Sequence, residues 1–277
     1  EVDPEKVLAA LMDMGFDDVF EVASGADIAT FLTAEYLKRK RRKTPAISAA
    51  CPAVVRLIQV RFPALIDCLI PVDSPMACSG KLAKEMKSKE LQIPMENIGA
   101  FFITPCPAKV TWIREANKHG TFPVDGAISI SDVYGEIVKR LPEVSRPYPK
   151  PKASPMGVGW GRSGGERIAA RVAKSLVVDG IHNVIEVLEQ LEMGKLQHIE
   201  FVEAQACIGG CVGGALTVLN PFIGRMNLEA LVDKSETRPE MVEEFAEGLK
   251  LKERLGEFTI QPDIVAVPAF RLDQDVS

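Results

Sequence analysis

Apolar and polar positions follow two different periods along the chain. Stretches in which apolar residues recur every three or four positions predict helices, and short unbroken apolar runs predict buried strands. The helical pattern covers residues 4–15, 26–43, 51–63, 74–87, 131–141, 165–176, 183–194 and 238–255. The strand pattern covers residues 16–23, 46–50, 98–105 and 198–204. Because helices and strands take turns, we predict parallel α/β layers.

Cap and breaker residues refine these boundaries. Pro4 lies in the first turn of the first predicted helix, and Gly15 follows its end. Ser131 is the expected N-cap of the helix that begins there. A proline-rich stretch at residues 146–155 interrupts the alternation, so we predict a linker in that place.

Composition and charge restrict the possible classes of function. The 277 residues are enough for one large domain or two modest ones. Lys and Arg number 33 against 38 Asp and Glu, a net charge of −5 that gives no reason to expect a nucleic acid partner. No apolar stretch is long enough to span a membrane, and no signal-peptide pattern opens the sequence. We therefore expect a soluble cytoplasmic protein.

The cysteines are the first candidates for chemistry. In a reducing compartment they are buried apolar residues, metal ligands or reactive thiols rather than a disulfide framework. Cys51, Cys106 and Cys207 each fall where a predicted strand gives way to a loop or helix, and Cys211 lies just beyond. Ligands gather at this rim of open α/β sheets. Four thiolates converging there would suit zinc or an iron–sulfur cluster.

Four glycines accompany the last two cysteines: Gly209, Gly210, Gly213 and Gly214. Residues without a Cβ would let the backbone approach a bulky anionic cluster and direct N–H groups toward it. The C-x2-C spacing that is usual for zinc is absent. We therefore favour an iron–sulfur cluster, and a glycine-rich turn with two buried cysteines is the simpler alternative.

Three segments resemble the signature segments of a known family, the iron-only hydrogenase large subunit. They are SAACPAVVRLI at 48–58, ITPCPAKV at 103–110 and VEAQACIGGCVGGA at 202–215, in the family's order. SPMACSGKLAK at 74–84 and GWGRSGGERIAAR at 159–171 are similar to two further segments of that family. The resemblance spans about residues 16–220.

The resemblance implies a fold, a cofactor and a reaction. The fold would be α/β, with two sheet-containing lobes and flanking helices around a buried metal-cluster cleft. Residues 1–277 would form one such domain, with the lobes meeting near 146–155. The cofactor would be the H-cluster, a 4Fe-4S cluster bridged by a cysteine to a di-iron centre with CO, cyanide and azadithiolate. The reaction would be the reversible interconversion of H2 with two protons and two electrons.

The resemblance also implies roles for individual residues. Cys51, Cys106 and Cys207 would hold the 4Fe-4S cluster, and Cys211 would hold it and bridge to the di-iron centre. Lys109 matches a lysine that hydrogen-bonds a cyanide, which suits a mobile ammonium donor; the alternative is a lysine that extends to water. The other matched positions are a serine near the second cyanide, two pocket-lining residues, and three places where the family usually has another contact: Ser74, Trp160, Gly161, Met76, Thr104 and Gln205.

Departures from the family pattern concern proton transfer. Ala50 stands where fast members have a proton-passing cysteine, and Ile70 stands where they have a serine. Their first proton-path glutamate aligns near Thr33 or Glu35. Proton transfer needs a titratable group within hydrogen-bond reach, so we expect slow turnover. The pattern resembles the sensory branch of the family, in which the cluster reports H2 or redox state to a signalling partner; a ferredoxin-like electron carrier is the other expected partner.

Two further expectations complete the sequence-based interpretation. The alternative function is a hydrogenase-like iron–sulfur protein that binds only a 4Fe-4S cluster, with an assembly or electron-transfer role; Lys109 and the spacing of Cys207 and Cys211 favour the complete H-cluster. The resemblance implies an upstream strand and ferredoxin-like modules with further 4Fe-4S clusters, which we expect a missing N-terminal segment to supply. Cys68 is expected in the core, and Cys78 is a minor candidate for a proton or redox role.

Overall fold

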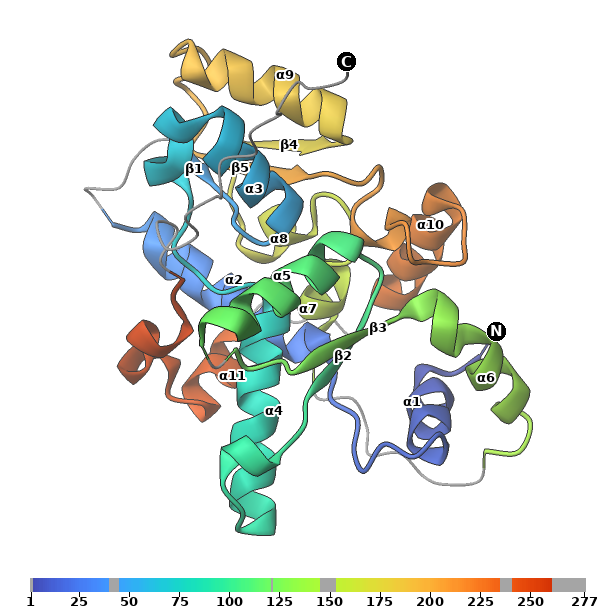
Figure 1. Cartoon of the computed structure of the whole chain (residues 1–277). Coiled ribbons are helices and arrows are strands. Elements are labelled where there is room, and N and C mark those ends of the chain that lie inside the picture. The colour runs from blue at the N-terminus through green and yellow to red at the C-terminus, as the bar shows by residue number, and fades with distance from the viewer. Residues whose placement is uncertain (1, 40–44, 121, 145–152, 235–240, 261–277) are drawn as a thin grey trace, which may run out of the picture.

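The computed structural model describes residues 2–39, 45–120, 122–144, 153–234 and 241–260. Two small parallel sheets are surrounded by helices, so the predicted α/β class is confirmed (Figure 1). Residues 146–152 of the predicted linker, and with them most of the expected junction between lobes, lie outside the described residues.

The larger sheet has the strand order β1 (Ala46–Ile47), β5 (Phe201–Gln205), β4 (Ser175–Asp179), and all its pairs are parallel. Helices α3 (Pro52–Arg61) and α9 (Ile181–Glu192) flank it (Figure 1). Their apolar faces join the strands in one core cluster that includes Ile47, Val54, Ile58, Leu188 and Val202. Covering helices bury a parallel sheet, which explains why β5 reads as an apolar run.

The smaller sheet pairs β2 (Phe101–Thr104) with β3 (Gly126–Ser129) in parallel. Each strand runs into a helix at its carboxyl end: β2 into α5 (Pro107–His119) and β3 into α6 (Ile130–Arg140). The N-cap of α6 is Ser129, whose Oγ accepts a hydrogen bond from the backbone N–H of Asp132. The predicted cap at Ser131 is therefore wrong by two positions.

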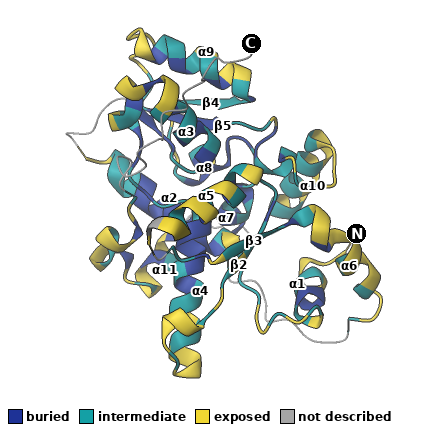
Figure 2. Cartoon of the chain, in the orientation of Figure 1, coloured by how far each residue is buried: buried dark blue, intermediate teal, exposed yellow. Residues whose placement is uncertain are grey.

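The centre of the molecule is formed by α2 (Val22–Leu37) and α4 (Pro75–Leu91), which pack against each other. Figure 2 shows α2 and the upper part of α4 as buried, whereas the lower end of α4 is exposed. A Cβ at Gly25 would lie 2.2 Å from the carbonyl oxygen of Pro75, so this close crossing requires glycine. The short helix α7 (Pro155–Gly159) also packs against α2, and the short helix α8 (Gly165–Ala169) packs against α7.

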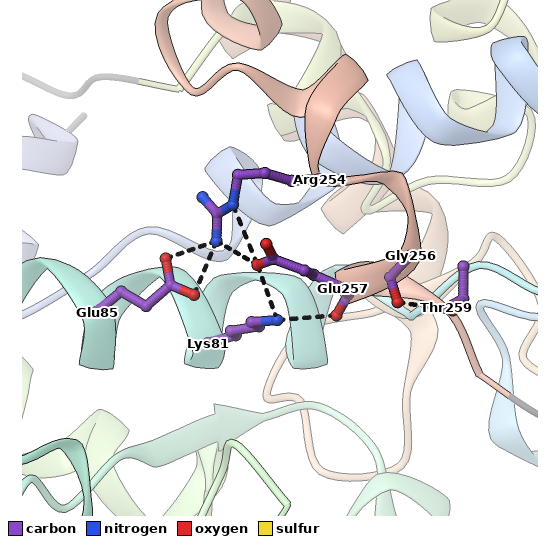
Figure 3. Close-up of polar contacts among 6 residues, drawn as sticks. All are labelled: Lys81, Glu85, Arg254, Gly256, Glu257 and Thr259. Carbon is purple, nitrogen blue, oxygen red and sulfur yellow. Dashed lines mark hydrogen bonds and ion pairs between the residues drawn. The ribbon is translucent and has the colours of Figure 1, made fainter.

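The remaining elements are α1 (Pro4–Asp13), η1 (Pro63–Cys68), η2 (Met95–Asn97), η3 (Cys211–Gly213), α10 (Pro221–Asp233), α11 (Met241–Gly248), η4 (Leu251–Glu253) and η5 (Leu255–Phe258). Side-chain contacts hold η4 and η5 against α4 (Figure 3). Arg254 Nη2 donates to both carboxylate oxygens of Glu85 at 2.8 Å, and Lys81 Nζ donates to the backbone oxygen of Glu257 at 2.9 Å. Among the described residues, no helix is long and apolar enough to cross a membrane.

Several predicted elements are wrong in type or length. No strand forms at 16–23: residues 16–21 are irregular, and α2 begins at Val22. The helix predicted at 165–176 ends as α8 at Ala169, and the chain then forms β4. Short apolar runs fit a strand or a buried helix equally well, and only pairing with β5 decides between them here. Strand β3 and helices α5 and α10 were missed, and residues 40–43 of the predicted second helix lie outside the described residues.

Candidate metal centre

Four cysteines follow the carboxyl ends of parallel strands: Cys51, Cys106, Cys207 and Cys211. Cys51 is the N-cap of α3 after β1, Cys106 is the N-cap of α5 after β2, and Cys207 and Cys211 lie in the turn after β5. The two sheets thus direct their strand ends toward one region, where ligands collect in folds of this type.

Burial and neighbouring thiols affect the ionisation of Cys51 and Cys207. Burial raises the pKa of the Cys51 thiol, and the charge of Cys211 raises it further. Burial also raises the pKa of Cys207 to about 11, with additional contributions from Cys106, Cys51 and Cys211. Thiolates so placed are unfavourable without a cation, and bound metal removes this penalty because a coordinating thiol is deprotonated outright.

The arrangement of the thiols bears on the kind of metal. Within the part of the chain that the structure describes, no three His, Cys, Asp or Glu side chains gather closely enough to hold a single metal ion. A tetrahedral zinc ion needs its ligands in one tight group. A cluster spaces its ligands more widely, so the donor set fits an iron–sulfur cluster better than zinc.

Lys109 lies among these thiols. It belongs to the first turn of α5, three residues after Cys106. Its side chain is 9% exposed, and its Nζ lies 3.6 Å from the Sγ of Cys211. Burial by itself would lower the pKa of Lys109, but the charges of Cys211, Cys106 and Cys51 and the bond to Cys211 raise it. The lysine is therefore a buried cation for the cysteine site and does not extend to water.

The glycines of the 207–214 turn approach other backbone segments. A Cβ at Gly214 would lie 2.2 Å from the carbonyl oxygen of Pro105, and one at Gly210 would lie 2.5 Å from the backbone nitrogen of Ser163. Gly210 also has a φ of +95°, which side chains rarely adopt. These two glycines let the turn pack against the segments that carry Cys106 and Trp160.

Backbone hydrogen bonds tie the turn to residues 161–163. The N–H of Val212 donates to Gly161 at 3.0 Å, and the N–H of Ser163 donates to Gly209 at 3.0 Å. The neighbouring Trp160 is 8% exposed, and its Nε1 donates to Thr30 Oγ1 at 2.8 Å. Trp160 and Gly161 are therefore fixed next to the cysteine turn and to α2.

Ala50 opens onto a cavity of about 10 Å³, about the volume that holds one water molecule. Thr33, Ile70 and Trp160 line the same cavity. The structure therefore brings together positions that the sequence singled out separately. Glu35 does not belong to this group, because it lines a different pocket of about 140 Å³.

The remaining candidate site residues lie in different surroundings. They are Ser74, Met76, Thr104 and Gln205. Ser74 Oγ accepts the N–H of Ala77 at 3.4 Å and caps α4. Thr104 is fully buried, and its Oγ1 accepts the N–H of Cys106 at 3.2 Å. Met76 is 2% exposed and packs in an apolar cluster next to the smaller sheet.

Gln205 is the member of this set with an unused polar atom. Its Nε2 donates to Glu203 Oε1 at 3.5 Å, and its Oε1 is buried with no hydrogen-bond partner among the described residues. A buried acceptor without a partner, two residues before Cys207, is consistent with a site built for an additional group.

The cysteines outside the set of four are also accounted for. Cys68 is partly buried against the core cluster of the larger sheet, as predicted. Cys78 is fully buried, and its Sγ donates to the backbone oxygen of Asp73 at 3.5 Å.

The sequence interpretation missed a buried pair of carboxyl groups. Glu203 of β5 is 1% exposed and accepts the backbone N–H groups of Gly164 and Arg167, both at 2.8 Å. Glu166 of α8 is 4% exposed and accepts hydrogen bonds from Ser48 and Thr33. The signal in the sequence was a glutamate inside an apolar strand, which is costly unless partners satisfy it.

Known proteins resemble this chain in sequence. The family profile described as "Iron only hydrogenase large subunit, C-terminal domain" matches residues 1–170 and 160–215. A subunit of the NADP-reducing hydrogenase of Solidesulfovibrio fructosivorans is 26% identical over 263 residues, which cover 76% of this chain and 44% of that protein. Iron hydrogenase 1 of Clostridium pasteurianum is 24% identical over 268 residues, covering 78% of this chain and 46% of that protein. The chain thus spans about half the length of these two relatives.

A relative of a different kind is a probable cytosolic Fe-S cluster assembly factor of Brugia malayi, 24% identical over 254 residues, covering 73% of this chain and 55% of that protein. Among solved structures, an FeFe-hydrogenase superimposes with a TM-score of 0.74 at 18% identity, covering 94% of this chain and 87% of that chain. The fold and the family profile agree with the donor set, and the chain belongs to the family formed by the C-terminal domains of iron-only hydrogenase large subunits.

Proposed function

We propose that this chain binds an H-cluster and interconverts H2 with protons and electrons slowly, as an oxidoreductase that reports H2 or redox state. The single observation that supports this most is the buried ammonium of Lys109 against Cys211, surrounded by three further thiols. A buried ammonium is a compact positive donor with rotatable N–H groups, which suits an anionic cyanide ligand.

The proposal gives each residue of the site a role. Cys51, Cys106, Cys207 and Cys211 would hold the cluster. When bound, the H-cluster would supply the iron that exchanges electrons with H2. Lys109 would donate a hydrogen bond to its anionic ligands. The residues that line or brace the di-iron pocket are Ser74, Met76, Thr104, Trp160, Gly161 and Gln205.

We infer slow turnover and sensing from the side chains that line the cavity at Ala50. Ala50 and Ile70 present only methyl and methylene groups there, so neither residue can pass a proton. A site that turns over slowly suits a reporter of H2 better than an enzyme of bulk H2 metabolism. Its partner is then a cytoplasmic signalling protein or a ferredoxin-like electron carrier.

A second candidate is a protein that carries only a 4Fe-4S cluster and serves in cluster assembly. The similarity to the Brugia malayi assembly factor favours it, as does a segment of 107 residues that is 30% identical to a cytosolic Fe-S cluster assembly factor of Aspergillus terreus. The presence or absence of the di-iron centre separates the two candidates.

The experiment is anaerobic reconstitution with iron and sulfide, addition of a synthetic di-iron precursor, and infrared spectroscopy with and without H2. Bands of CO and cyanide that shift under H2 are expected. A protein loaded with the 4Fe-4S cluster but lacking those bands would favour the assembly role. Cys211→Ala should abolish the bands, and Cys68→Ala is the matched control because Cys68 packs against the core instead.

A further inference from the structure

A second cavity, of about 140 Å³, lies between α2, the end of α8, α11 and η4. Helix α11 packs against both α2 and η4. No residue lines both this cavity and the one at Ala50, and none of the four candidate cysteines lines it. An apolar cavity of about 150 Å³ holds a benzene molecule, so this space admits a small organic molecule.

Apolar side chains form the most buried part of the lining. Phe31 of α2, Ala169 of α8 and Val242 of α11 are 8%, 7% and 6% exposed. Ala34 and Ala170 also contribute methyl groups. Removal of apolar surface from water is favourable, so this part of the cavity suits the hydrocarbon body of a ligand.

Charged side chains form the more exposed part of the lining. Lys38 Nζ lies 2.6 Å from the carboxylate of Glu35, and a guanidinium nitrogen of Arg171 lies 3.8 Å from the carboxylate of Glu243. Lys252 is exposed and forms no ion pair with another residue that the structure describes. Three cations against two carboxylates leave an excess of one positive charge. Exposed ion pairs contribute little to stability, so Lys38 and Arg171 can bind a ligand instead at small cost.

Arg171 has an unusual backbone conformation for its residue type. Its φ of +54° lies in the left-handed region that glycine adopts easily and other residues rarely adopt. It directly follows Ala170, the C-cap of α8, at a position where glycine is common. An arginine side chain is thus kept at a place where glycine would fit with less strain. Its planar fork of N–H donors matches the two oxygens of a carboxylate.

We propose that this cavity binds a small organic monocarboxylate. Arg171 and Lys252 hold the carboxylate, and the apolar body lies against Phe31 and Val242. The single excess positive charge matches a monoanion, whereas the two carboxylates of the lining repel a dianion such as phosphate. Binding is noncovalent, and the site contains none of the candidate cysteines, so the inference does not rest on the proposed function.

Thr30 connects the cavity to a spectroscopic reporter. Thr30 lines the cavity, and its Oγ1 accepts a hydrogen bond from Trp160 Nε1 and donates to the backbone oxygen of Ala26, both at 2.8 Å. Trp160 is one of two tryptophans in the chain. A ligand that fills the cavity next to Thr30 should therefore change the fluorescence of Trp160, and Trp160→Phe should remove that change.

The test uses benzoate as the probe and the full chain, both before and after reconstitution with iron and sulfide. Benzoate should bind with a dissociation constant in about the millimolar range, measured by ligand-observed NMR and by tryptophan fluorescence. Benzyl alcohol has the ring without the charge, and acetate has the charge without the ring. Each should therefore bind at least about fivefold more weakly than benzoate.

Variants at the cavity distinguish a specific site from nonspecific binding. Arg171→Gln and Lys252→Gln should each weaken benzoate binding by about fivefold, the upper range for an exposed ion pair. Both side chains are exposed, so the variants should fold, which circular dichroism checks. Lys174→Gln removes an exposed cation outside the cavity and is the matched control, with unchanged binding.

Four outcomes would overturn the proposal. They are absence of benzoate binding, equal binding of benzoate and benzyl alcohol, equal binding by Arg171→Gln and Lys174→Gln, and tighter binding of inorganic phosphate than of benzoate. Because the measurement needs no di-iron centre, a failure of the proposed function would leave its result unchanged.

Discussion

Lys109 and Cys211 are 102 positions apart in the sequence, yet the Nζ of the lysine lies 3.6 Å from the Sγ of the cysteine. The contact joins the start of α5, after the smaller sheet, to the turn after β5 of the larger sheet. Because the cation is buried, its charge acts on the thiolates with little screening by water.

Replacing Lys109 with Met should weaken cluster binding. The change keeps the length of the side chain but removes the only cation within the thiol group that the structure describes. We expect the affinity for iron to fall by about 10–100-fold, as is typical when a residue that supports metal ligands is lost. Iron and sulfide content after reconstitution measures this. Lys118→Met, on the exposed part of the same helix, is the control and should retain its iron.

Introducing a thiol at Ala50 should speed turnover. Ala50→Cys places a transferable proton at the cavity next to the cysteine site. We expect H2 turnover in the fully loaded protein to rise by roughly 100-fold, the lower range for a positioned acid–base group. Ala50→Val, which adds bulk without a proton, should not raise the rate. An unchanged rate in Ala50→Cys would mean that proton delivery is not what limits this protein.

Stability should fall as the pH rises toward 8. The pKa of Glu166 is raised from 4.5 to about 8 by burial and by Glu203, so between these pH values the folded state binds a proton that the unfolded chain releases. The free energy of unfolding then decreases with pH, by at most about 1.4 kcal/mol per pH unit for one proton. Asp27 and Asp73, with pKa values of about 6, contribute only to the acidic part of this window.

Urea unfolding at several pH values measures this slope. Glu166→Gln should flatten it between about pH 6 and 8, whereas Asp27→Asn should flatten only the part below about pH 6. A slope in Glu166→Gln equal to that of the wild-type protein would show that Glu166 is ionised in the folded state.

Cys78 should be inert toward alkylation. Its complete burial raises its pKa well above the ordinary value, with a further contribution from Asp73, and the thiolate is the reactive form. Iodoacetamide followed by mass spectrometry should label Cys78 only after unfolding. Cys78→Ala should lower stability by about 1 kcal/mol without changing turnover. A slower enzyme with intact infrared bands would instead give Cys78 a proton or redox role.

The contact of Arg254 with Glu85 should hold the segment 251–258 on α4 (Figure 3). Both side chains are mostly buried, at 22% and 15% exposure, and Glu257 binds the same guanidinium at 2.7 Å. Arg254→Met should lower the free energy of unfolding by about 1 kcal/mol, which is toward the upper end for ion pairs near the surface. The loss should be smaller at high salt. Hydrogen exchange of residues 251–258 should increase. Arg140→Met, in a pair on α6 with a more exposed partner, should leave that exchange unchanged.

The four cysteines of the candidate site and its lysine could be identified from the sequence because each belongs to a short local motif. A cysteine followed by proline at the end of an apolar run predicts a strand that passes into a helix, and both Cys51 and Cys106 proved to be helix N-caps. The α/β class followed likewise from the alternation of periods along the chain. Local patterns therefore predicted the class of fold, which the structure confirms, and the candidate donor set.

The surroundings of that donor set were decided by tertiary structure alone. Glu166 and Ser48 are 118 positions apart and Glu166 and Thr33 are 133 apart, so no local pattern shows that these residues surround one carboxyl. The short strands were also undetermined, because β4 and β3 become strands only by pairing with partners elsewhere in the chain. Burial between packed layers raises the pKa of Glu166, and burial depends on the whole fold. The sequence thus predicted which residues could hold a metal cluster, and the packing of helices against the sheets decided which residues surround them.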